Sequence, residues 1–163
     1  MKFLSLKYIS IIVLFQLLAY PLMAQKSKEA DEVLYKKVFL INDNGDKFDK
    51  LSQVYGSTLF SACHFEGELY TNTWSNVVKT IQESCVNGGL DINNYEIWIK
   101  VFFDTSGSIN FIGYNPTSSS KPIDSKKFEE ILNKMIENYN CGVKSTDKFA
   151  QSSRILFPIN FEN

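Results

Sequence analysis

The chain has 163 residues, of which 17 are basic and 18 acidic, so its formal net charge is −1. This near-neutral chain has no basic stripe and gives no reason to expect nucleic-acid binding. Its 13 Phe, 8 Tyr and 2 Trp residues favour a core rich in β-sheet.

The first 24 residues have the three parts of a secretory signal peptide. Lys2 and Lys7 give a positive start, and residues 8–19 form an almost unbroken apolar run. Pro21 then breaks the helix, and Ala24 is the small residue before the expected cut. An uncleaved anchor would need about 20 mostly apolar residues, and this stretch is shorter and interrupted. We therefore expect a protein without a permanent membrane anchor, in the periplasm or secreted.

Removing residues 1–24 leaves 139 residues, an ordinary size for one domain. No metal or dense disulfide framework is needed for a chain of this size to fold. Residues 25–32 are polar and predict a flexible N-terminus, so the expected domain is 33–163. Because the signal peptide holds two lysines and no acids, the mature chain carries 15 basic and 18 acidic residues.

The first part of the domain, residues 33–72, predicts extra strands joined by turns. The expected elements are a strand at 33–42, a turn at 43–46, a strand at 53–62, a turn at 65–68 and a short strand at 69–70.

A helix follows, because apolar side chains recur every three or four residues after a Thr73 cap. The stripe consists of Trp74, Val77, Val78, Ile81 and Cys85, and glycines at 88 and 89 end the helix.

Residues 95–104 predict the clearest strand, with four apolar side chains on one face at period two: Ile97, Ile99, Val101 and Phe103. A turn at 104–107 leads into a returning strand. There Ile109, Phe111 and Gly113 are expected to alternate with Asn110, Ile112 and Tyr114.

Asp124 or Ser125 caps a second amphipathic helix, whose apolar stripe consists of Phe128, Ile131, Leu132, Met135, Ile136 and Tyr139. Residues 140–142 end it, and 142–152 predict a loop. The last strand is expected at 154–161, at a sheet edge because Pro158 has no N–H to donate. The order of elements predicts an α+β, two-layer sandwich: a mostly antiparallel sheet with two helices on one face.

From 73 to 161 the pattern resembles the C-terminal domain of the TonB family of energy transducers. The matching pieces are residues 99–104, Gly107-Ser108-Ile109, the helix at 128–136 and Phe157-Pro158-Ile159-Asn160-Phe161. The chain lacks the family's permanent anchor and its Pro-rich linker, since only residues 26–32 separate the apolar segment from the first strand. Energy coupling across the envelope is therefore not expected.

The resemblance implies a binding mode in which a partner's extended segment pairs with an exposed edge strand. The corresponding positions are Arg154, Leu156, Pro158 and Asn160. The alternative is an edge covered by the C-terminus or by the extra N-terminal strands.

Catalytic chemistry finds little support in the sequence. Cys63 and His64 are adjacent, but neighbours in a strand point to opposite faces, so a structural role for Cys63 is favoured. Asp43, Asp46 and Asp49 do not have the spacing of a calcium loop and are interpreted as a polar turn. We expect no catalytic residue, cofactor or metal site.

The chain has 3 cysteines, an odd number, so at most one intramolecular disulfide can form. In the expected topology Cys85 and Cys141 lie at opposite ends of the domain, beyond disulfide reach. The preferred pair is therefore Cys63 with Cys85, and three free thiols are the alternative.

The sequence thus predicts an exported, non-enzymatic module that binds a protein or peptide in the bacterial envelope. The alternative is a small inhibitor or immunity-type protein. Such a protein would present Trp74, Trp98 or the Ser-rich loop at 117–120 to an enzyme.

Overall fold

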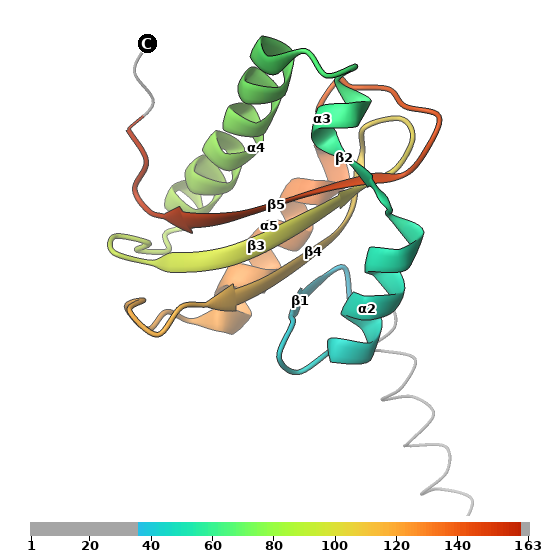
Figure 1. The fold of residues 1–163 in the computed structure, drawn as a ribbon. Coiled ribbons are helices and arrows are strands. Elements are labelled where there is room, and N and C mark those ends of the chain that lie inside the picture. Colours follow the sequence, from blue (N-terminus) through green and yellow to red (C-terminus); the bar gives the residue numbers. More distant parts are fainter. Residues whose placement is uncertain (1–35, 161–163) are drawn as a thin grey trace, which may run out of the picture. The chain divides into compact units, whose positions relative to one another are not determined.

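The computed structural model describes residues 36–160. The expected signal peptide, the N-terminus at 25–32 and the start of the first expected strand lie outside this range. From Lys37 onward the chain forms one compact unit. Its elements (Figure 1) are β1 (Val38–Leu40), α2 (Gly45–Val54), β2 (Ser57–Thr58), α3 (Leu59–Ala62), α4 (Gly67–Asn87), β3 (Glu96–Phe103), β4 (Ile109–Pro116), α5 (Ser125–Asn138) and β5 (Phe149–Leu156).

The five strands form one mixed sheet in the order β1-β4-β3-β5-β2. The central strand β3 is antiparallel to β4 and to β5 along most of its length. The short strands β1 and β2 add in parallel at the two ends of the sheet. The α+β class is therefore confirmed, and the long ladders of the sheet are antiparallel as expected.

The main core lies between the sheet and the helices α4 and α5. Ile97, Ile99, Val101 and Phe103 are fully buried on this face, as their period-two spacing predicts. The helices contribute the buried residues of their predicted stripes: Val77, Val78, Ile81, Cys85, Phe128, Leu132 and Ile136. The predicted cap of α5 is confirmed, since the Asp124 carboxylate accepts a hydrogen bond of 3.0 Å from the Lys127 N–H.

Helix α2 covers part of the opposite face of the sheet (Figure 1). Its Phe48 and Leu51 pack against a second cluster that includes the buried side chains of Phe39 and Phe102. Phe102 neighbours residues of the main core in sequence but points to the other face, because strand side chains alternate. The expected two-layer arrangement is thus not confirmed, since helices lie on both faces.

The N-terminal part differs most from expectation. Helix α2 replaces the end of the expected turn, β2 and α3 replace most of the strand expected at 53–62, and the short strand expected at 69–70 lies within α4. Thr58 begins α3 with a capping box, in which its side chain and that of Ser61 each bond the other's backbone N–H.

The returning strand β4 contains a bulge that reverses its expected faces. Phe103 pairs with Ile109 and Phe102 pairs with Phe111, which leaves Asn110 as an extra residue. Beyond this point Ile112 and Tyr114 join the main core, where continuous alternation from Ile109 would have placed Phe111 and Gly113. The expected alternation is therefore wrong after Asn110.

The last strand begins and ends earlier than expected, at Phe149 and Leu156. Its polar residues Gln151, Ser152 and Ser153 also pair with β3. They can do so because the strands are joined by main-chain hydrogen bonds, which do not depend on side-chain polarity. The ladder ends before Pro158, which has no N–H to donate. Among residues 36–160, no helix has both the length and the apolar character needed to cross a membrane.

Candidate functional site

The outer edge of β5 is open over most of its length. Strand β2 pairs with β5 only at Phe149 and Ala150. Within residues 36–160, no strand pairs with the outer edge of β5 from Gln151 to Leu156. Of the four positions expected on an edge strand, Arg154 and Leu156 lie on this open stretch. Pro158 and Asn160 follow it as irregular chain.

The direction of the main-chain groups follows from the register. The Phe157 N–H donates to the Tyr95 carbonyl, and the register continues from this pair through Ile155 opposite Ile97. Because hydrogen-bonded and non-bonded pairs alternate in an antiparallel ladder, the N–H and C=O groups of Ser152, Arg154 and Leu156 point away from β3. These are the groups that an added strand would use.

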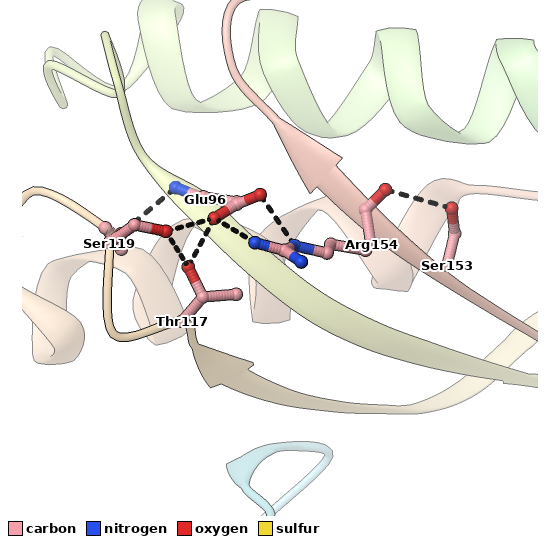
Figure 2. Close-up of polar contacts among 6 residues, drawn as sticks. Glu96, Thr117, Ser119, Ser153 and Arg154 are labelled. Atoms are coloured by element: carbon pink, nitrogen blue, oxygen red, sulfur yellow. Dashed lines mark hydrogen bonds and ion pairs between the residues drawn. The ribbon is translucent and has the colours of Figure 1, made fainter.

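Two of these outward carbonyls accept hydrogen bonds from neighbouring side chains. The Gln151 amide donates to the Ser152 carbonyl at 2.8 Å. The Ser153 hydroxyl donates to the Arg154 carbonyl at 3.3 Å (Figure 2). Each donor side chain belongs to the residue just before the carbonyl that it bonds, and neither bond is part of the ladder with β3. An incoming strand could therefore replace both bonds without disturbing the sheet.

A groove of about 580 Å³ runs between this edge and the first half of α4. Its walls combine apolar and polar side chains from the helix, the strand and the chain that follows it. They are Asn72, Trp74, Ser75, Val78, Ser153, Arg154, Ile155, Ile159 and Asn160. Trp74, Val78, Ile155 and Ile159 also pack on the main core, so the floor of the groove is apolar and fixed.

Gln82 of α4 holds the chain that closes one end of the groove. Its side-chain amide donates to the Ile159 carbonyl at 3.2 Å. Its side-chain oxygen accepts from the Ile159 N–H at 2.7 Å. Ile159 is therefore fixed against the helix by its own backbone.

Arg154, which lines the groove, belongs to a cluster with three other polar side chains, Glu96, Thr117 and Ser119 (Figure 2). The Glu96 carboxylate accepts from Arg154 Nε at 2.6 Å and Nη2 at 2.9 Å. It also accepts from the hydroxyls of Thr117 and Ser119, each at 2.6 Å. These bonds, that from Arg154 first, lower the pKa of Glu96 to about 2.

The surfaces named for an inhibitor are largely engaged within the fold. Thr117 and Ser119 bond Glu96, which ties down the Ser-rich loop. The half-buried Trp98 ring lies 5.9 Å from the Phe48 ring, and Trp74 lines the groove. Neither tryptophan nor the loop therefore projects from the surface without contacts to the rest of the fold.

The turn between α3 and α4 instead presents aromatic rings to solvent. Phe60 and Phe65 are 40% and 69% exposed, and their rings pack edge to face at 5.4 Å. His64 and Phe65 have φ of 54° and 63°, a left-handed conformation that is uncommon outside glycine. We call this exposed segment, residues 60–65, the aromatic turn. At the start of α4 the Tyr70 ring packs on Phe60 at 5.5 Å, and Leu69 is 40% exposed. The sequence predicted a turn at 65–68 but not its exposed aromatic rings, because residues 53–62 were expected to form a strand where α3 forms instead.

The structure does not bring the expected disulfide partners together. The Cys63 thiol is hydrogen bonded to Thr73. Cys85 lies in α4, 12 residues after Thr73, which places it about 18 Å from Thr73 at a rise of about 1.5 Å per residue. That separation far exceeds the Cα distance of about 6 Å that a disulfide spans.

Cys63 is also poorly suited to be the nucleophile of an enzyme. It is fully buried, and burial raises the pKa of its thiol. A catalytic cysteine needs the opposite shift, because the thiolate is the reactive form. Within residues 36–160, no three His, Cys, Asp or Glu side chains lie close enough to hold a metal ion.

Compared with protein-family models, with curated proteins and with solved structures, the chain shows no match in any of the three.

Proposed function

We propose that this chain is an exported, non-enzymatic binding module of the bacterial envelope that takes up an extended segment of a partner protein on the outer edge of β5. The observation that carries the proposal is the open stretch from Gln151 to Leu156 beside the groove against α4. In this mode of recognition, main-chain hydrogen bonds supply affinity and side-chain pockets supply selectivity.

The geometry defines what such a segment must offer. Its main chain would bond the outward groups of Ser152, Arg154 and Leu156, in place of the Gln151 and Ser153 side chains. Every second side chain of the segment would enter the groove, because strand side chains alternate. The apolar floor of the groove favours an aliphatic or aromatic residue at those positions.

The sequence supports two further parts of the proposal. Residues 1–24 have the pattern of a cleavable signal peptide, which supports export to the periplasm or beyond. The pieces of sequence between 73 and 161 that resemble TonB C-terminal domains support a shared fold, including its edge-strand binding. An experimental structure whose α4-to-β5 backbone fails to superpose on those domains would remove the second part.

A proline at position 156 tests the edge directly. Leu156→Pro removes an N–H that points away from β3, so the ladder with β3 keeps its hydrogen bonds. Leu156→Ala is the matched control, since it shortens the side chain and keeps the N–H. Losing one intermolecular hydrogen bond and the close approach around it should weaken partner binding by about tenfold, or about 1.4 kcal/mol.

The measurement is capture of a partner from envelope extract by the two variants and the original protein, followed by titration of the captured partner. Hydrogen exchange on the complex should show slower exchange at Ser152, Arg154 and Leu156. Equal affinity of the proline and alanine variants, without protection at these amides, would exclude edge pairing.

The inhibitor-type alternative is tested in the same experiment, through the exposed aromatic turn. Phe65→Ala removes the most exposed large side chain of that turn. If Phe65→Ala abolishes capture while Leu156→Pro leaves it intact, the partner contacts the turn, and a blocking protein becomes the better description.

A further inference from the structure

Two of the three cysteines lie at the same end of the domain. Cys63 is the residue directly after α3, and its thiol is hydrogen bonded to Thr73 in the first half of α4. Figure 1 shows α3 beside the chain that connects α5 to β5, and Cys141 lies at the start of that connection. Both side chains belong to or pack against the main core.

The packing of α4 and α5 explains this placement. The helices run antiparallel: the Lys127 ammonium at the start of α5 donates a hydrogen bond of 2.8 Å to the Gly89 carbonyl, just after the end of α4. Tyr139, just after α5, is hydrogen bonded to Thr80 in the middle of α4. From Tyr139 the chain runs on toward the end of α4 that contains Thr73, and Cys141 lies two residues along it.

Cys141 is held there by the tip of the β3–β4 hairpin. Its N–H donates to the Gly107 carbonyl at 2.9 Å. The amide of Asn140 donates to the Ser106 carbonyl and to the Ser108 hydroxyl, each at 3.0 Å. The Cys141 side chain is partly exposed and lies within electrostatic range of Cys63.

Cys85 occupies the other end of the domain. It is fully buried and lies within electrostatic range of Tyr95, which precedes β3. Much of the length of α4 separates it from Thr73 and from the end of the domain where the other two cysteines lie.

We propose that Cys63 and Cys141 form a disulfide when the protein meets a small disulfide oxidant, and that Cys85 stays a thiol. The cross-link would join α3 and the aromatic turn to the chain that leads into β5. It is independent of the proposed binding function, since neither sulfur lines the groove.

The chemistry balances as two exchange steps with oxidised glutathione. The Cys141 thiolate, the more exposed of the two, attacks the glutathione disulfide and releases one glutathione thiolate. The Cys63 thiolate then attacks the Cys141 sulfur of the mixed disulfide and releases the second. The two protein thiols lose two electrons and two protons, and the glutathione disulfide gains the electrons.

The test uses the purified full chain and oxidised glutathione under native conditions. After oxidation the protein is unfolded and its remaining thiols are alkylated with iodoacetamide, and its peptides are mapped by mass spectrometry. We expect a single linkage between the Cys63 and Cys141 peptides, and alkylation at Cys85 alone. Burial raises the pKa of both reacting thiols, so the rate should rise about tenfold per unit between pH 7 and 9.

Two variants separate the pairing from a general effect on folding. Cys141→Ser should leave Cys63 and Cys85 as thiols, while Cys85→Ser should form the linkage as the original protein does. Three free thiols after oxidation, a linkage that includes Cys85, or dimers joined through Cys141 would each overturn the proposal.

Discussion

Gly107 closes the β3–β4 hairpin where no larger residue fits. Its φ is +89°, which side chains other than hydrogen rarely allow. A Cβ at this position would also collide with the Val143 carbonyl oxygen and press on the Cys141 sulfur. The hairpin tip, the end of α5 and the connection to β5 therefore meet at one glycine.

This meeting point gives a prediction with an internal control. Gly142 also has a positive φ, of +78°, but nothing lies within 4 Å of the position of its Cβ. Gly142→Ala should therefore cost only the backbone strain, about 1–2 kcal/mol. Gly107→Ala should lose about 1–3 kcal/mol more through the collision. Urea unfolding measures both, and equal losses would show that the contacts at Gly107 do not matter.

At the level of elements, α2 is the only helix of the described residues on the second face of the sheet. It is attached mainly by Phe48, whose ring lies 5.9 Å from the ring of Trp98 and 6.2 Å from that of Phe102. Lys100 adds a hydrogen bond of 3.0 Å to Ser52. The helix has no buried residue, so its attachment depends on half-buried side chains, Phe48 and Leu51, and on this hydrogen bond.

Phe48→Ala should destabilise the protein by about 2 kcal/mol, below the 3–5 typical of a fully buried Phe because Phe48 is half buried. The fluorescence of the neighbouring Trp98 should shift toward that of an exposed indole. Val54→Ala on the same helix is the control, since Val54 is 58% exposed. It should change stability by less than about 0.5 kcal/mol. A similar effect of both changes would mean that Phe48 does not hold α2 in place.

The same elements show what a sequence can predict. α4, α5 and β3 were predicted because their apolar residues repeat over three or more turns or along a whole strand. The predicted start of α4 was wrong, since the helix begins at Gly67 and the expected cap, Thr73, is a buried residue inside it. α2 was missed because only Phe48 and Leu51 mark its inner face. The predicted bounds of β5 were too late in the sequence because Gln151, Ser152 and Ser153 are polar and suggested a loop. In the structure they pair with the backbone of β3.

The candidate site was predictable only in part, for a related reason. Pro158 pointed to an edge near β5, but the groove requires α4 to lie alongside that edge. The polar cluster joins Glu96 of β3, Thr117 of the loop after β4 and Arg154 of β5, and no local pattern connects them. The Cys63–Cys85 pairing failed because α3 was not foreseen, and α3 places Cys63 at the other end of α4.

For the whole molecule, the Glu96 cluster links the start of β3, the loop after β4 and the end of β5. The pKa of Glu96 is lowered from 4.5 to about 2, so its ionised form is favoured by folding. Its contribution to stability is complete above pH 4.5 and is lost as the pH falls through about 2.

Glu96→Gln should therefore be less stable than the original protein at pH 7, and the difference should shrink between pH 4.5 and 2. Urea unfolding of both proteins at pH 7, 4, 3 and 2 measures this. Asp91 and Asp104, whose pKa values are also lowered, are present in both proteins and cancel in the comparison. A difference that does not change with pH would show that Glu96 acts through its shape and not its charge.

The two parallel end strands have a consequence for the order in which the chain can fold. Val38 pairs with Ile112, and Ser57 pairs with Phe149, which are 74 and 92 positions apart. Each of these short strands thus finds its partner only after a long stretch of later chain has been made, up to residue 114 for β1 and up to residue 150 for β2. Contacts of this sequence separation slow folding, because a long loop must close before they form. The hairpin of β3 and β4 joins neighbouring segments and can form early, whereas β2 cannot pair until β5 has been made, so we expect that end of the sheet to close late.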